Sequence, residues 1–80
     1  MSIGLPTQAV HRHHVWTWDF IFDQADSGGM LKMMTLLDEY TRQCLTIRVE
    51  RQITSAQVVE VLEEAIRQYG IPSYIHSDNG

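Results

Sequence analysis

The segment VWTWDFIFD, residues 15–23, is the starting point for predicting the fold. Aromatic side chains recur at every second position, and this period-two pattern of aromatic and β-branched residues is typical of a β-strand. Trp16, Trp18, Phe20 and Phe22 would share one face of that strand. Because the other face also carries apolar residues, we expect the strand to lie in the interior of its sheet.

Two further strands follow at short intervals. The turn sequence QADSGG separates the first strand from MLKMMTLLD, residues 30–38, which predicts an antiparallel hairpin. After EYTR, the segment QCLTIRVE, residues 43–50, predicts a third strand. Its apolar residues alternate with Thr46, Arg48 and Glu50, so we expect these polar residues to face water and the strand to lie at an edge.

One helix is predicted over about residues 55–69, where TSAQVVEVLEEAIRQYG places apolar residues at steps of three and four. Thr54 and Gln57 fit a capping box, although Ser55 is an alternative cap. Gly70 is the expected C-terminal stop.

The order strand, strand, strand, helix, strand predicts an α/β domain with a mixed sheet. The last strand, SYIHSD at residues 73–78, should return through a right-handed crossover and lie parallel to an earlier strand. Residues 1–14 show no periodicity and predict a linker or disordered arm, which leaves 15–80 as one domain. No apolar run approaches the roughly 20 residues that a membrane span requires, so we expect no membrane association.

Composition places the chain among ordinary globular proteins, with 44% hydrophobic and 20% charged residues. The net charge of −4 argues against a generic DNA-coating surface, but acids that hold metal ions also count as negative. Cys44 has no internal disulfide partner and lies in an apolar run. It therefore predicts a reduced core thiol in a cytoplasmic protein.

Two acids are the main candidates for chemistry. If the last strand pairs beside the first, Asp19 and Asp78 come together, and paired carboxylates favour a cation such as Mg²⁺ or Mn²⁺. A third carboxylate would be needed to hold two ions firmly. The alternatives are a structural hydrogen-bond acceptor for Asp19 and ordinary turn chemistry for Asp78, since DNG is a common turn. Spacing alone does not decide between them.

Three other groups of residues have more than one possible role. The histidines of the arm, His11, His13 and His14, either bind a metal or belong to a solvated linker. Trp16 and Trp18 of the first strand either stack on bases or pack in the core beneath the helix. The methionines of the second strand, Met30, Met33 and Met34, are interpreted as core or hairpin filling.

The motifs WTWDF, LLDEYTR and HSDNG, with the helix between the last two, resemble the DDE transposases of bacterial insertion sequences. The catalytic core of that family is similar to retroviral integrases, and the resemblance covers residues 15–80. It implies a ribonuclease-H-like fold with sheet order 3-2-1-4 and a fifth strand beyond. The chain would be the first half of that core, in a bacterial cytoplasmic protein.

The resemblance also implies roles for individual residues. Asp19 and Asp78 match the first two catalytic acids, which would ligate two Mg²⁺ (or Mn²⁺) ions in the complete core. The implied reaction is DNA cleavage followed by strand transfer, with transposon ends and target DNA as partners. Asn79 and Gly80 match the turn after the second acid, where Asn79 would support the site or touch DNA.

LLDEYTR matches a recurring segment of the family outside the acidic residues. We interpret Asp38, Glu39 and Arg42 as turn and scaffold residues, with Arg42 pairing a neighbouring acid and a third-ligand role for Asp38 as the alternative. His76 is expected to be a sheet residue near the site rather than a direct participant. Asp23 should lie about 13 Å from Asp19 along the strand, too far to share an ion.

The third acid of the family, a glutamate, and the fifth strand would follow Gly80. We therefore expect the isolated chain to be inactive, and its last strand to self-associate through an open edge. The alternative function is a non-catalytic assembly or interaction fragment with a ribonuclease-H-like half-fold. A ribonuclease H shares the fold, but DEYTR and SDNG favour a transposase.

Overall fold

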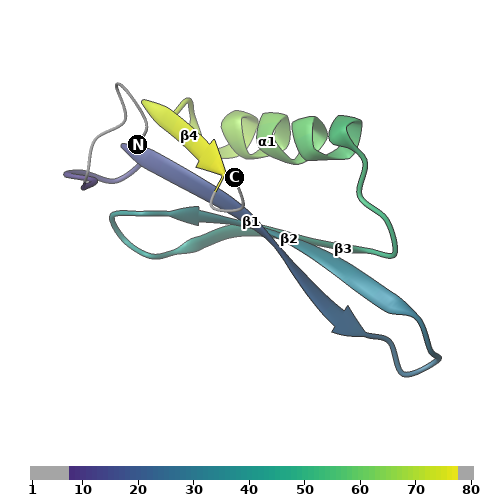
Figure 1. Ribbon diagram of the computed structural model, residues 1–80. Helices are drawn as coiled ribbons and strands as arrows, with labels where there is room; N and C mark the ends of the chain where they lie inside the picture. The colour runs from purple at the N-terminus through teal and green to yellow at the C-terminus, as the bar shows by residue number, and fades with distance from the viewer. Residues whose placement is uncertain (1–7, 78–80) are drawn as a thin grey trace.

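The computed structural model describes residues 8–77 and contains four strands and one helix in this part of the chain (Figure 1). The elements are β1 (Val15–Gln24), β2 (Met30–Asp38), β3 (Cys44–Glu50), α1 (Ser55–Tyr69) and β4 (Tyr74–Ser77). The strands form one sheet in the order β3-β2-β1-β4, with β1 antiparallel to β2 and parallel to β4. The predicted order 3-2-1-4 is confirmed, as are the interior position of β1 and the edge position of β3.

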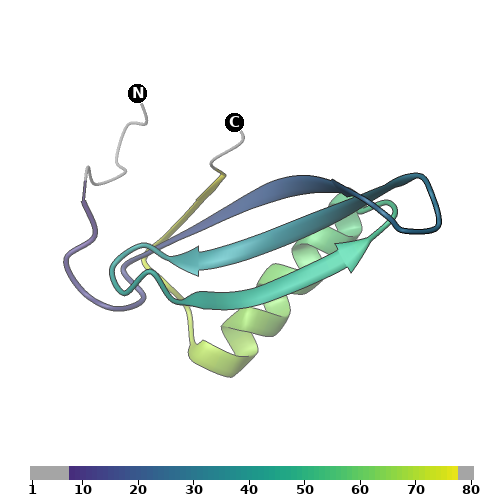
Figure 2. The ribbon, with the colours of Figure 1, turned by 90° about the horizontal axis from the view of Figure 1, so that it is seen from below.

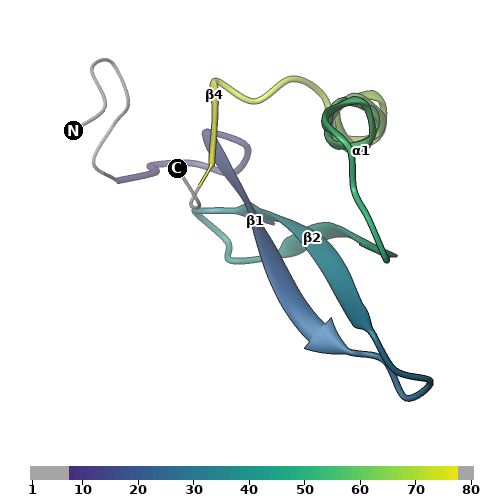
Figure 3. The ribbon, with the colours of Figure 1, turned by 45° about the vertical axis from the view of Figure 1, so that its right-hand side comes forward.

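The helix covers one side of the sheet, as Figure 3 shows with α1 seen nearly along its axis. The helix packs against side chains from β1, β2 and β3. Trp16, Met34 and Leu36 have no exposed surface and pack with Val61 and Ala65 of α1. This burial supports core packing rather than base stacking as the role of the aromatic residues at the start of β1.

Both ends of α1 follow the sequence prediction. The Gln57 N–H donates to Thr54 Oγ1 at 3.2 Å, and the Thr54 N–H donates to Gln57 Oε1 at 2.8 Å, so Thr54 is the cap of a capping box. Gly70 adopts φ 95° and its N–H donates to the Ile66 carbonyl. A residue without a Cβ adopts this left-handed backbone at little cost. None of the described helices is long and apolar enough to cross a membrane.

The expected faces of β3 are wrong after Leu45, which is buried in the core as expected. Thr46 and Arg48 point toward α1 and are partly buried, whereas Ile47 and Val49 point away and are 55% and 49% exposed. The pairing of β2 with β3 contains a register shift near the start of β3. A shift of one residue exchanges the two faces of a strand, and the alternation in sequence cannot reveal it.

The assignment of Cys44 to the core is wrong. Cys44 is exposed rather than buried, because it lies at the irregular start of β3. Among the methionines assigned to core or hairpin filling, Met34 is fully buried, whereas Met30 is 55% exposed beside the β1–β2 turn.

Candidate metal centre

Asp19 lies on the face of the sheet that points away from α1. We call this the outer face; it carries Thr17 and Asp19 of β1 and His76 of β4. Asp19 is partly buried, and its Oδ1 accepts a hydrogen bond of 2.8 Å from the N–H of Phe20. This bond fixes one carboxylate oxygen against the backbone of β1.

The strand β4 runs beside Asp19. Its pairing with β1 is parallel and includes Thr17↔His76 and Trp18↔Ser77, one residue before Asp19. Opposed residues in a sheet point to the same side, so His76 shares the outer face with Thr17 and Asp19. His76 is partly buried in the sheet, as expected. Asp78, Asn79 and Gly80 lie outside the described residues.

A hydrogen-bonded network adjoins Asp19 on the outer face. The buried hydroxyl of Thr17 donates to Glu39 Oε1, and Arg42 Nη1 donates to Glu39 Oε2 at 3.1 Å. The predicted pairing of Arg42 with a neighbouring acid is confirmed. Thr17 was not predicted as a residue of the site, although side chains alternate along a strand and Thr17 therefore shares a face with Asp19.

Asp38 is a structural residue. It has no exposed surface, and its carboxylate accepts hydrogen bonds from the N–H groups of His13 and Tyr40 and from the hydroxyl of Thr41, at 3.4, 3.2 and 3.0 Å. Its position in β2 places it on the α1 side of the sheet, away from Asp19. These contacts support the scaffold interpretation over the third-ligand alternative.

The described arm histidines bond within the protein. Nδ1 of His13 accepts from the indole N–H of Trp16 at 2.9 Å, and Nδ1 of His14 accepts from the Val10 N–H at 3.0 Å. His11 stacks on His14. Within residues 8–77 no three His, Cys, Asp or Glu side chains are grouped so that they could hold a metal ion. These contacts attach the arm to β1 and within itself, and they account for the histidines better than metal binding does.

Two further features lie apart from Asp19. Asp23 is exposed near the far end of β1, beyond the extent of β4, and accepts a hydrogen bond from the N–H of Gln24.

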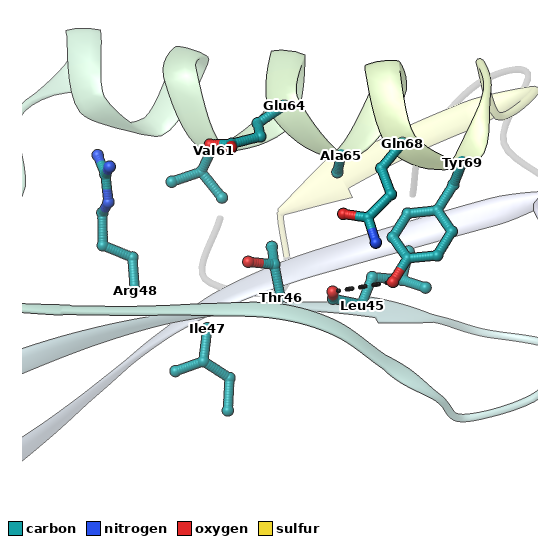
Figure 4. Close-up of a pocket in the computed structure, with 9 residues that line it drawn as sticks. All are labelled: Leu45, Thr46, Ile47, Arg48, Val61, Glu64, Ala65, Gln68 and Tyr69. Atoms are coloured by element: carbon teal, nitrogen blue, oxygen red, sulfur yellow. Dashed lines mark hydrogen bonds between the residues drawn. The ribbon is translucent and has the colours of Figure 1, made fainter.

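A hollow of about 250 Å³ lies between β3 and α1, with Thr46, Arg48 and Glu64 among its lining residues (Figure 4). The sheet separates this hollow from the outer face, so it is not part of the Asp19 site.

The architecture is that of the ribonuclease-H-like class. A chain in the cryo-electron-microscopy structure of a simian T-cell lymphotropic virus intasome, in complex with the PP2A regulatory subunit B56 gamma, shares it with a TM-score of 0.77. That match has 22% sequence identity and covers 91% of this chain and 28% of the other. Residues 9–80 match the sequence model of the integrase core domain, and the chain belongs to that family.

Two relatives come from bacterial insertion elements. The uncharacterized 39.2 kDa protein of insertion element IS476 from Xanthomonas euvesicatoria is 35% identical over 65 residues, which is 81% of this chain and 19% of the relative. The uncharacterized 31.7 kDa protein of insertion element IS407 from Burkholderia multivorans is 31% identical over 68 residues, 85% of this chain and 24% of the relative. The chain thus spans about a fifth to a quarter of the length of these relatives.

Proposed function

We propose that this chain supplies the first two metal-binding acids of a transposase core that cuts DNA and joins the strands. The supporting observation is the parallel register of β1 and β4, whose last described pair is Trp18↔Ser77. If the register continues by one pair, Asp78 lies opposite Asp19 on the outer face. Membership of the integrase core family supports the same reaction class.

The chemistry of the donor set fits a hard divalent cation. Two adjacent carboxylates repel each other unless a cation lies between them, and Mg²⁺ and Mn²⁺ prefer oxygen ligands. Asp19 has one oxygen held by the Phe20 N–H, and we assign the other to the ion. When bound, a pair of such ions activates a water or 3′-hydroxyl and stabilises the leaving oxygen.

The described contacts near Asp19 tie the β2–β3 turn to β1. Thr17 bonds Glu39, whose backbone N–H donates to the Val15 carbonyl at 2.9 Å, so the β2–β3 turn is tied to β1 beside the site. Glu39 is also paired with Arg42, which makes it a supporting residue rather than an ion ligand. Asn79 and Gly80 are proposed to support the second acid or contact DNA.

Transposon ends and target DNA are the proposed substrates of the complete protein, in the bacterial cytoplasm. Within residues 8–77 the sheet ends at β4, whose one strand neighbour is β1. The edge of β4 away from β1 is the proposed site of self-association, because exposed strand edges recruit other chains.

Manganese titration monitored by NMR tests the metal site. Mn²⁺ should broaden the signals of Asp19 and Asp78 selectively in the native chain, and Mg²⁺ should shift them. Asp19→Asn and Asp78→Asn should each remove the effect at both positions, whereas the control Asp23→Asn on the same strand should leave it unchanged. Unselective broadening, or broadening that survives both substitutions in a folded chain, would contradict the proposal.

A further inference from the structure

The side chain of Arg42 is linked through Glu39 to Thr17 on the outer face. Arg42 lies in the β2–β3 turn, and its Nη1 is 3.1 Å from Oε2 of Glu39. The other oxygen of Glu39 accepts from the hydroxyl of Thr17. Thr17 precedes Asp19 by two residues on one strand face, a separation of about 7 Å. Figures 1 and 2 show this turn at the same end of the sheet as β4.

The backbone of the turn does not account for an arginine here. Arg42 adopts φ 63°, in the left-handed region, which costs an L-residue roughly 1–2 kcal/mol. Its N–H donates to the Asp38 carbonyl at 2.8 Å, a bond that any residue other than proline could make. Glycine would satisfy the same turn without the steric cost.

The ion pair with Glu39 does not account for an arginine at position 42 either. The side chain of Arg42 is 76% exposed, and an exposed ion pair contributes only about 0–1 kcal/mol. The contact with Glu39 uses one of the five donors of the guanidinium. The pair therefore holds the guanidinium beside Glu39, and the described contacts of Arg42 leave most of its donors for another acceptor.

We propose that Arg42 binds a phosphate of the DNA strand beside the proposed metal site. This inference rests on the proposed function, because it places DNA on the outer face. The planar guanidinium matches the oxygens of a phosphate in a two-pronged contact, and phosphate contacts position a DNA strand without reading its sequence. Arg42 is thus a positioning residue, and its charge offsets the acids that would otherwise repel a phosphodiester there.

The test is a titration of the chain with a short DNA duplex at low salt, observed through the Nε–Hε signals of arginine. The signal of Arg42 should shift. Arg42→Gly should weaken DNA binding severalfold and reduce the slope of log affinity against log salt by about 0.9. Because it relieves the left-handed backbone, it should leave the unfolding midpoint unchanged or raise it. Arg67→Ala removes the same charge from α1 and should weaken binding less.

The outcomes separate this inference from the proposed function. An unmoved Arg42 signal, the absence of any DNA binding, or equal losses for Arg42→Gly and Arg67→Ala would overturn it. A large fall in stability for Arg42→Gly would also overturn it, because the residue would then be structural. If Mn²⁺ broadens the Asp19 signal but DNA does not shift the Arg42 signal, the phosphate contact is wrong and the metal site stands. If DNA shifts the Arg42 signal but Mn²⁺ does not broaden Asp19, the metal site is wrong and the phosphate contact stands.

Discussion

Replacing Asp38 with alanine should destabilise the fold strongly, although the residue is remote from the proposed chemistry. The carboxylate has no exposed surface and accepts three hydrogen bonds. The bonds at 3.0 and 3.2 Å are of ordinary length, and each hydrogen bond to a charged group contributes about 1.5–3 kcal/mol. Counting these two at the lower figure gives a loss of about 3 kcal/mol.

That loss is large for a chain of this size. By the usual stability per residue, 80 residues correspond to a free energy of unfolding of about 4–12 kcal/mol. Urea unfolding followed by tryptophan fluorescence measures the change, because Trp16 lies in the core. With a slope near 1 kcal/mol/M, the midpoint of Asp38→Ala should fall by about 3 M.

A matched control and an intermediate variant sharpen the measurement. Asp23→Ala removes an exposed acid whose one described hydrogen bond is to the N–H of its own neighbour, and it should cost less than about 0.5 kcal/mol. Asp38→Asn keeps the size and one acceptor oxygen, so its stability should lie between Asp38→Ala and the native chain. A loss for Asp38→Ala no larger than that for Asp23→Ala would refute the scaffold role.

Three further predictions concern the core, the helix and the thiol. Met34→Ala should lower the free energy of unfolding by about 2–5 kcal/mol in the same urea assay, because Met34 is fully buried; a cost like that of exposed Met30→Ala would contradict this packing. Thr54→Ala should cost about 1 kcal/mol through loss of the cap, whereas Ser55→Ala should cost less; the reverse order would show that Ser55 is the cap. Cys44 should react with a thiol reagent in the folded chain as quickly as in urea, since it is exposed; protection on folding would show that it is buried.

The order of elements could be predicted because local signals agree along this chain. Alternating aromatics mark β1, the QADSGG turn forces a hairpin, and Thr54 with Gln57 marks the start of the helix. The right-handed crossover rule then leaves few places for β4. Each of these signals depends on side chains a few residues apart, which a sequence displays directly.

Features that depend on contacts between distant segments could not be predicted. The shift in the β2–β3 register leaves no mark in the alternation of β3, and it exposes Ile47 and Cys44. The burial of Asp38 requires the arm, the turn and β2 to meet, and a buried charged residue is uncommon.

Some features of the candidate site could be predicted from the sequence and others could not. The alternation of side chains along a strand predicts the face on which Asp19 lies, and the crossover rule predicts the direction of β4. The hydrogen bond from Thr17 to Glu39 could not be predicted, because it joins two segments more than 20 residues apart, whereas the pairing of Arg42 with Glu39, three residues away, was predicted. The left-handed backbone of Arg42 was equally hidden, since arginine carries no preference for that conformation.

The proposed metal site requires Asp78 to lie opposite Asp19, and the backbone register at the end of β4 shows whether it does. Nuclear Overhauser contacts in an isotope-labelled chain should extend the parallel ladder of Thr17↔His76 and Trp18↔Ser77 by one more pair, which joins Asp19 to Asp78. That result would place both carboxylates on the outer face. A ladder that ends at Ser77, or one displaced by a single residue so that Asp78 points to the α1 side, would contradict the account.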